Sequence, residues 1–460
     1  MELVSTVNDT WKYFAAGSFV GFTLLLLLAY QTQPYTSLLA TQNTVVEFAS
    51  LSEAAAIKPL EHFNITVISE KLNTTSFDQD VDEKKNTTTS VDDNLMNTTS
   101  VDEDDEKPAN KKNCNMFEGR WVYMPEEDPS YDSTKCPFME EKMSCQKNGR
   151  PDSEYEKWRW EANDCDIPLF NGVDMLERLR NKRVIMAGDS LNRNMWMSLA
   201  CLLYSSIPSS SVEVSAESPV YKVLKAKDYN CTVEFYWSPF LVEFVEKHAS
   251  GRKVLVLDKL SPNSVQWKGA DVMVFNSGHW WLHGGKMRSW DLFEYEGKLV
   301  EEMPIELAYE RAMTAWSTWI NKNVYVDPNK TTIFFRGLSA VHQTSADWCY
   351  NITQPIDEES IKSSPQRSDV LVNVIKNVIQ GMSNIIQVKY LNITKLSQYR
   401  IDAHPSIYRS SQWQLMIKKF ENSLTGYADC SHWCLPGLPD TWNRLLYAFL
   451  FYNTFGDMST

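Results

Sequence analysis

Apolar runs and helical patterns alternate along the chain from residue 184 to residue 391. The first run is Val184–Ala187, and four later runs are predicted to be buried strands: Lys253–Leu257, Asp271–Phe275, Thr331–Phe335 and Ile385–Leu391. Apolar residues recur at helical spacing over Ile305–Trp319 and Val370–Gly381, which predicts helices there. Strands that alternate with helices predict an α/β fold with a layered, mainly parallel sheet flanked by helices.

The N-terminal region has a different pattern. Residues 13–30 contain no charge and include the pure leucine run Leu24–Leu28, so we expect an uncleaved transmembrane signal anchor of just sufficient length. Lys12 precedes this segment and no Lys or Arg follows it until Lys58. The positive-inside rule therefore places residues 1–12 in the cytosol as a short tail and the bulk of the chain in the lumen. The alternative is a cleaved signal peptide.

Residues 31–110 are polar and self-similar. Copies of one Asn-Thr-Thr pattern, each leading to an acidic residue, begin at Asn73, Asn86 and Asn97. Such a segment buries too little apolar surface to offset its chain entropy, so we expect a disordered, acidic, glycosylated stem. The glycosylation motif Asn-x-Ser/Thr occurs there and later in the chain, at Asn64, Asn73, Asn86, Asn97, Asn230, Asn329, Asn351 and Asn392. The predicted lumenal catalytic domain is then 111–460.

The formal net charge of −14 is concentrated in this stem. The segment Glu61–Glu106 contains 13 Asp and Glu against 3 Lys, which accounts for −10 and leaves −4 for the rest of the 460 residues. The chain therefore has no overall basic field, and we expect no nucleic-acid partner. With 43% hydrophobic residues over its full length, the chain can bury a full core.

Nine cysteines follow the stem and are spread over the rest of the chain. They lack the tight pairs that are typical of metal sites, so we expect no metal and an oxidised domain with several disulfides. Cys231 lies inside a glycosylation motif and is the candidate for the unpaired thiol. The disulfide candidates are the other eight: Cys114, Cys136, Cys145, Cys165, Cys201, Cys349, Cys430 and Cys434.

One serine lies where a nucleophile would be activated. The stretch Gly188-Asp189-Ser190-Leu191 ends the first apolar run, and the helical spacing that begins at Leu191 places Ser190 at a helix N-terminus. Unpaired backbone N–H groups and the helix dipole favour a developing negative charge there. A serine hydroxyl also needs a base that is held by a carboxylate. Near the C-terminus the sequence offers Asp429 and His432, three residues apart.

Longer motifs accompany these residues, namely Cys145–Asp152, Trp158–Trp160, Asn276–Trp281 and Asp429–Asn443. Together with Gly-Asp-Ser-Leu they closely resemble the plant trichome-birefringence-like family of polysaccharide O-acetyltransferases, within the GDSL/SGNH esterase-like superfamily. The resemblance runs from about Cys114 to the end of the chain. One stretch departs from it: residues 335–342 match only loosely the family's usual FRxxSPxH, so no role is assigned to His342.

The resemblance implies an SGNH-hydrolase-like fold with disulfide-linked additions, in a single-pass type II protein of the Golgi membrane. It implies transfer of acetyl groups to sugar hydroxyls of a wall polymer through an acetyl-serine. Ser190 would be the nucleophile, His432 the base and Asp429 its orienting carboxylate. Cys430 and Cys434 are too close to expect a bond with each other, so we expect each to reach elsewhere, with Cys349 and Cys145 as partners.

Further residues are candidates for oxyanion or substrate contacts: Asn276, Arg193, His279, Trp280 and Trp281. By resemblance, Asn276 corresponds to the superfamily's third-block asparagine, but it could instead satisfy backbone groups at a strand end. Arg193 could equally be a structural ion-pair partner. Trp280 and Trp281 are expected to contact substrate because aromatic faces suit the apolar faces of sugar rings, although most tryptophans are core residues.

No bound cofactor is expected, but an acetyl donor such as acetyl-CoA or another acetyl carrier is required. The expected partners are an acceptor polysaccharide (xylan, mannan, xyloglucan or pectin), the membrane, and Golgi proteins that supply the donor. Two alternatives remain open. The same triad would serve an acetyl esterase, in which water replaces the sugar, and a non-catalytic wall-polymer binding protein would carry a vestigial serine.

Overall fold

The computed structural model describes residues 114–214, 218–324, 330–342, 348–362, 368–382, 384–418 and 428–452. The predicted tail (1–12), anchor (13–30) and stem (31–110) lie outside these ranges. Within the ranges, none of the helices combines the length and the apolar character that a membrane crossing needs.

A seven-stranded sheet forms the centre of the domain, in the order β13-β12-β9-β3-β6-β5-β4. Its first five strands are parallel, and β5 and β4 add antiparallel pairs at one edge. The strands are β3 (Arg183–Gly188), β4 (Val212–Val214), β5 (Tyr221–Ala226), β6 (Cys231–Trp237), β9 (Val272–Phe275), β12 (Thr332–Arg336) and β13 (Val388–Leu391). The sheet is therefore mixed, with a parallel core around β3.

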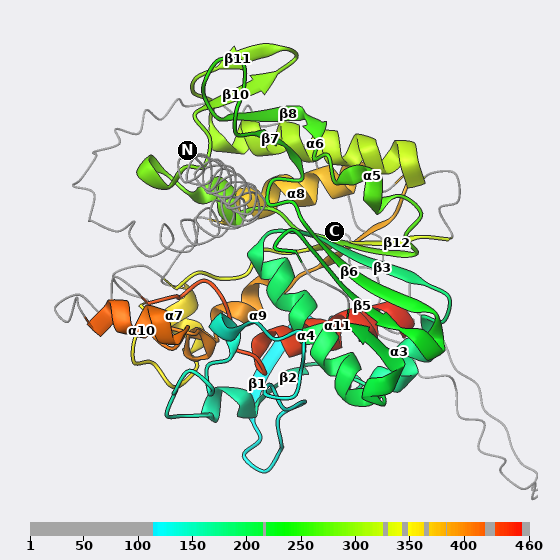
Figure 1. Ribbon diagram of the computed structural model, residues 1–460, viewed down its shortest axis with the longest axis vertical. Coiled ribbons are helices and arrows are strands. Elements are labelled where there is room, and N and C mark those ends of the chain that lie inside the picture. The colour runs from blue at the N-terminus through cyan, green and yellow to red at the C-terminus, as the bar shows by residue number, and fades with distance from the viewer. Residues whose placement is uncertain are drawn as a thin grey trace, which may run out of the picture. The chain divides into compact units, whose positions relative to one another are not determined.

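Helices cover both faces of this sheet (Figure 1). Alternate residues of β3 point to opposite faces. Val184 and Met186 pack with α3 (Gly172–Arg178), α4 (Ser190–Ser206) and α11 (Leu438–Phe451), whereas Ile185 and Ala187 pack with α6 (Ile305–Val324) and α8 (Asp369–Met382). This arrangement confirms the predicted layered α/β fold, in which a buried parallel sheet separates two apolar cores.

The apolar run at 253–257 forms a strand, but in a different sheet from the one predicted. β8 (Val254–Leu260) lies in a four-stranded sheet of order β11-β10-β8-β7, antiparallel to β7 and parallel to β10. The pattern of buried residues predicts that a strand forms and does not specify its neighbours. The other strands of this sheet are β7 (Val242–Val245), β10 (Leu292–Tyr295) and β11 (Lys298–Val300).

Shorter elements complete the domain. β1 (Gly119–Tyr123) and β2 (Trp158–Ala162) pair antiparallel in a separate two-stranded sheet. The remaining helices are α5 (Ser264–Trp267), α7 (Glu358–Lys362), α9 (Thr394–Gln398) and α10 (Ser411–Lys418). The four disulfides are Cys114–Cys165, Cys136–Cys201, Cys145–Cys434 and Cys349–Cys430, and Cys231 is a buried free thiol.

Gly188 ends β3 at a point where the neighbouring chain leaves no room for a side chain. A Cβ atom there would overlap the Asn276 side chain and lie 2.7 Å from the Asn276 backbone oxygen. Gly188→Ala should therefore lower the free energy of unfolding by about 1–3 kcal/mol, because a packed backbone must shift. The measurement is urea unfolding.

Gly284→Ala is the matched control for Gly188→Ala. Gly284 has an ordinary extended backbone, and nothing lies within 4 Å of its Cβ position. Its substitution should change stability by no more than about 0.5 kcal/mol. Equal stabilities for the two variants would contradict the close approach of β3 and residue 276.

Candidate active site

Ser190 is the first residue of α4, directly after β3. Asp189 caps the helix, since its Oδ1 accepts a hydrogen bond of 2.9 Å from the Leu191 backbone N–H. As the first helical residue, Ser190 has a backbone N–H with no carbonyl partner one turn earlier in the helix. Ser190 is 8% exposed. The turn thus presents both a hydroxyl and a backbone donor at the carboxyl end of a central parallel strand, which is where ligands bind in α/β sheets.

The loop before α11 brings an imidazole to this serine. His432 Nε2 lies 2.8 Å from Ser190 Oγ, and His432 Nδ1 lies 2.9 and 3.1 Å from the two carboxylate oxygens of Asp429. The carboxylate accepts, so Nδ1 carries the proton and Nε2 presents a lone pair to the serine hydroxyl. Two distant parts of the sequence therefore supply the three residues of the hydrogen-bonded chain that activates a serine nucleophile.

Arg409 completes the surroundings of the carboxylate. Its Nε lies 3.3 Å from Asp429 Oδ2, and its guanidinium packs 4.7 Å from the centre of the Trp413 ring. Burial alone would raise the pKa of Asp429, but the charges of His432 and Arg409 and the hydrogen bonds from His432 hold it well below the ordinary value. Arg409 was not predicted from the sequence, because it lies 20 residues before Asp429 in no motif.

The loop that carries His432 is fixed on both sides. Disulfides join Cys430 to Cys349 and Cys434 to Cys145, so the two neighbouring cysteines bond to the partners expected from the sequence. Between them, the Asn194 side chain on α4 accepts from the Trp433 N–H at 2.8 Å and donates to the Trp433 carbonyl at 3.2 Å. The helix that begins with the serine thus also holds the backbone beside the histidine.

Two further histidines support the same loop from behind. His404 Nδ1 donates to the His432 carbonyl at 2.6 Å, and its other ring nitrogen lies 2.7 Å from His342 Nδ1. The His404 ring stacks on Trp433 with 3.9 Å between ring centres. Burial, followed by the neighbouring His342, lowers the pKa of His404 well below its ordinary value. The sequence assigned no role to His342 and did not identify His404, which lies in none of the recognised motifs.

Asn276 lies next to the serine turn but is engaged with Asp189. Its Oδ1 accepts from the Asp189 N–H at 3.2 Å, and its Nδ2 donates to Asp189 Oδ1 at 3.0 Å. This is the strand-end alternative that the sequence left open. His279, four residues from the end of β9, lies on the other side of the Asp189 carboxylate, with Nδ1 3.8 Å from Asp189 Oδ2.

The remaining candidates occupy different positions. Arg193 is buried and lies 3.7 Å from Glu140, so the structure has the ion pair that was the alternative to a substrate contact. Trp281 is a correction: it is 1% exposed in the core, and its Nε1 donates to Ser277 Oγ, so its ring offers no face to a sugar. Trp280 is partly exposed and packs edge to face with Trp237 and Phe240.

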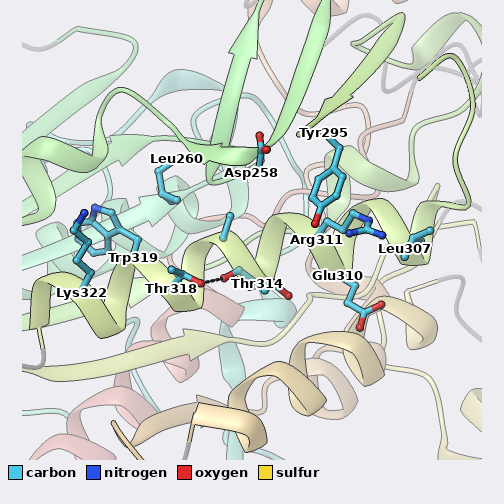
Figure 2. Close-up of a pocket in the computed structure, with 11 residues that line it drawn as sticks. Asp258, Leu260, Tyr295, Leu307, Glu310, Arg311, Thr314, Thr318, Trp319 and Lys322 are labelled. Carbon is cyan, nitrogen blue, oxygen red and sulfur yellow. Dashed lines mark hydrogen bonds between the residues drawn. The ribbon is translucent and has the colours of Figure 1, made fainter. Parts of the chain in front are cut away.

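A hollow of about 590 Å³ lies elsewhere, between α6 and the strands β8 and β10. Figure 2 shows Thr314, Thr318 and Trp319 along α6, and Arg311 packed against Tyr295 with 3.9 Å between guanidinium and ring centre. None of the predicted site residues lines it. Over the ranges that the structure describes, no cluster of three or more His, Cys, Asp or Glu side chains is arranged to hold a metal ion.

Comparisons with known proteins identify similar sequences. Residues 167–449 match the GDSL/SGNH-like acyl-esterase family found in Pmr5 and Cas1p, and residues 112–166 match the PMR5 N-terminal domain. The chain is 39% identical to trichome birefringence-like protein 43 of Arabidopsis thaliana over 75% of its length and 89% of that protein.

Two other relatives cover a similar part of the chain. It is 41% identical to the probable xylan O-acetyltransferase 10 of Oryza sativa subsp. japonica, over 74% of this chain and 78% of that protein. The chain is also 40% identical to the protein trichome birefringence of Arabidopsis thaliana. That match covers 74% of this chain and 56% of the relative.

The disulfide Cys145–Cys434 should control the reactivity of Ser190. Replacing both cysteines by serine should reduce labelling of Ser190 by a fluorophosphonate at least about tenfold, because the loop bearing His432 loses one of its anchors. The measurement is the initial labelling rate. The matched control is the Cys114→Ser, Cys165→Ser pair, which also loses a disulfide and about 2–4 kcal/mol of stability. Equal labelling of the two double variants would contradict the positioning role.

Arg409 should set the acid limit of the site. The folded-state pKa of Asp429 is depressed, so its pairing with His432 stabilises the site above the ordinary pKa and is lost as pH falls through the folded value. Arg409→Met removes a positive charge beside the coupled Asp429–His432 pair. The pair then takes up a proton more readily, so the acid limb of the labelling profile should move to higher pH by about one unit. Arg409→Lys should move it less. An unchanged profile in Arg409→Met would contradict the assigned electrostatic role.

Proposed function

Because the chain belongs to the GDSL/SGNH-like acyl-esterase family found in Pmr5 and Cas1p, we propose that it is a polysaccharide O-acetyltransferase that acts on a plant cell-wall polymer. The observation that carries this proposal is the 2.8 Å contact between Ser190 Oγ and His432 Nε2, with Asp429 bonded to the opposite ring nitrogen. This arrangement supports acyl transfer, whereas a purely binding protein has no use for all three groups in contact.

The first half of the reaction acetylates the enzyme. Ser190 Oγ attacks the carbonyl carbon of the acetyl donor while His432 Nε2 takes the hydroxyl proton. Asp429 stabilises the imidazolium that results and keeps the ring oriented. The tetrahedral oxyanion lies next to the N-terminus of α4, and we assign the Ser190 backbone N–H as one of its donors. Collapse expels the donor group, which takes the proton from His432, and leaves an acetyl ester on Ser190.

The second half transfers the acetyl group from Ser190 to a sugar. The acceptor hydroxyl attacks the acetyl-serine carbonyl while its proton passes to His432 Nε2. When the tetrahedral intermediate collapses, the C–O bond to Ser190 breaks, and the proton moves from His432 to the serine oxygen. The products are an O-acetylated sugar and the free enzyme, so one triad serves both halves.

Xylan is the acceptor we propose first. The support comes from two similar rice proteins. One is the probable xylan O-acetyltransferase 10 described above, and the other is the probable xylan O-acetyltransferase 8, which is 38% identical over 74% of this chain. Mannan, xyloglucan and pectin are the competing acceptors. The donor is an acetyl carrier such as acetyl-CoA, and we propose that partner proteins of the Golgi supply it.

We also propose that the protein is anchored in the Golgi membrane. The uncharged segment 13–30 supports a single-pass anchor, and the disulfides and glycosylation motifs support a lumenal catalytic domain in the Golgi.

A second candidate function is an acetyl esterase, which the family's description as acyl-esterases favours. In that reaction water would attack the acetyl-serine in place of a sugar.

Acceptor assays with Ser190→Ala test the proposed function. The purified protein is incubated with an isotopically labelled acetyl donor and deacetylated oligomers of xylan, mannan, xyloglucan or pectin. We expect label on the xylan oligomer, and a loss of at least about 10³-fold in Ser190→Ala because the nucleophile is absent. Ser205→Ala, which changes an exposed serine of the same helix, should retain activity.

Other outcomes of this assay separate the alternatives. Label on another oligomer would show that the acceptor is that polymer and not xylan, and it would still support a transferase. Release of acetate from pre-acetylated oligomers without donor, in the absence of transfer, would establish the esterase. Wild-type activity in Ser190→Ala would refute the triad.

A further inference from the structure

Three buried polar atoms at the Asp189 carboxylate, next to Ser190 in the chain, lack hydrogen-bond partners among the described residues. They are Asp189 Oδ2, His279 Nδ1 and Arg336 Nη2. The His279 nitrogen is 3.8 Å from Asp189 Oδ2, and the Arg336 nitrogen is 3.9 Å from Asp189 Oδ1. Asp189 and Arg336 are fully buried, and His279 is 9% exposed. Unsatisfied polar groups of this kind are costly, so their convergence next to a nucleophile indicates a function.

The tautomer of His279 follows from its neighbour. A carboxylate only accepts hydrogen bonds, so the nitrogen that faces Asp189 is the one that carries the proton. Burial lowers the pKa of His279 to about 4, Asp189 opposes this shift, and Arg336, His283 and His432 add to it. Above that pH the ring is neutral. Its Nε2 then presents a lone pair, on a side chain that retains 9% of its exposure.

We propose that Asp189 and His279 form a second carboxylate–imidazole pair beside Ser190, in which His279 Nε2 accepts a hydrogen bond from a hydroxyl of the acceptor sugar. This inference rests on the proposed function and deepens it. A lone pair repels the carbonyl oxygen of the donor and the oxyanion, and it attracts only a group with a proton to give, which a sugar hydroxyl has. His279 therefore discriminates between the two substrates of the reaction.

The surroundings of His279 fit a sugar. Trp280 follows it in the chain and is partly exposed, with Trp237 packed 5.5 Å from its ring centre. Aromatic rings at this position can pack against the apolar face of a sugar whose hydroxyl bonds to His279. The gap of 3.8 Å to Asp189 is longer than a hydrogen bond, and such bonds often tighten only when substrate is present.

Substitutions at two positions test the pair. His279→Phe removes the acceptor nitrogen, and His279→Gln keeps an acceptor oxygen at similar reach. Asp189→Asn retains the helix cap but offers an amide N–H to His279 Nδ1, which moves the ring proton to Nε2 and turns the acceptor into a donor. His248→Gln is the matched control, because His248 lies in the loop between β7 and β8, beside Glu294 on β10.

Two rates are measured for each variant: acetylation of Ser190 by the labelled donor alone, and transfer from the enzyme to a deacetylated xylo-oligosaccharide. We expect His279→Phe to slow transfer and raise the acceptor KM about tenfold, and to slow acetylation by less than about twofold. Asp189→Asn should raise the acceptor KM to a similar extent. His279→Gln should recover part of the transfer, and His248→Gln should match the wild type. Equal losses in both steps, or no loss in transfer, would overturn the proposal.

A binding measurement keeps this inference separate from the proposed function. Calorimetry compares the affinity of the oligosaccharide for Ser190→Ala with its affinity for Ser190→Ala, His279→Phe, so no chemistry is needed. An affinity about tenfold lower in the double variant supports the acceptor role of His279. This result would stand even if the wild type formed no acetyl-enzyme, because that failure would refute only the proposed transferase activity. Equal affinities, or no binding by either protein, would overturn the acceptor role.

Discussion

The contact between the start of α4 and the loop before α11 is the interaction on which the site depends. Ser190 and His432 are 242 residues apart, and a hydrogen bond of 2.8 Å requires both to be placed within a few tenths of an ångström. The central strand β3 positions the serine, and hydrogen bonding to β9 on one side and β6 on the other fixes the position of β3. The histidine comes from an irregular loop, which has no such support of its own.

The rest of the domain supplies that support. The loop is joined by disulfides to two distant segments, hydrogen-bonded by Asn194 from the serine's own helix, and backed by the His404 ring against Trp433. Arg409 and His432 together stabilise the ionised form of the buried Asp429 side chain, which burial alone would destabilise. A flexible element is thus held as rigidly as a strand, which is what a preorganised base requires.

The sequence predicts the local parts of this arrangement well. An apolar run that ends in Gly-Asp-Ser and continues at helical spacing specifies β3, the turn and α4, and the strands at 271–275 and 331–335 form close to their predicted positions. The strands β5 and β6 were missed because charged residues interrupt them; Glu234 is tolerated in β6 because Arg183 pairs with it at 2.7 Å. The membership of β8 in a second sheet depends on long-range pairing, which no local pattern records.

The same distinction applies to the site. Ser190, Asp429 and His432 belong to recognisable motifs, whereas Arg409 and His404 act only because the fold brings them to Asp429 and His432. Trp281 was expected at the substrate because its aromatic face suits a sugar ring and it lies close to the predicted site, but a turn of 3-10 helix over His279–Leu282 directs it into the core. Residue type and motif predict chemistry, and packing decides which of several neighbouring side chains faces the site.

The most direct measurement is mass spectrometry of the peptide that contains Ser190, after incubation with labelled acetyl donor and no acceptor. The double-displacement mechanism predicts one labelled acetyl group on Ser190 that disappears when deacetylated oligosaccharide is added, with equal label appearing on the sugar. Transfer to the sugar at full rate with no acetyl group ever detected on Ser190 would contradict the mechanism and require direct attack of the sugar on the donor.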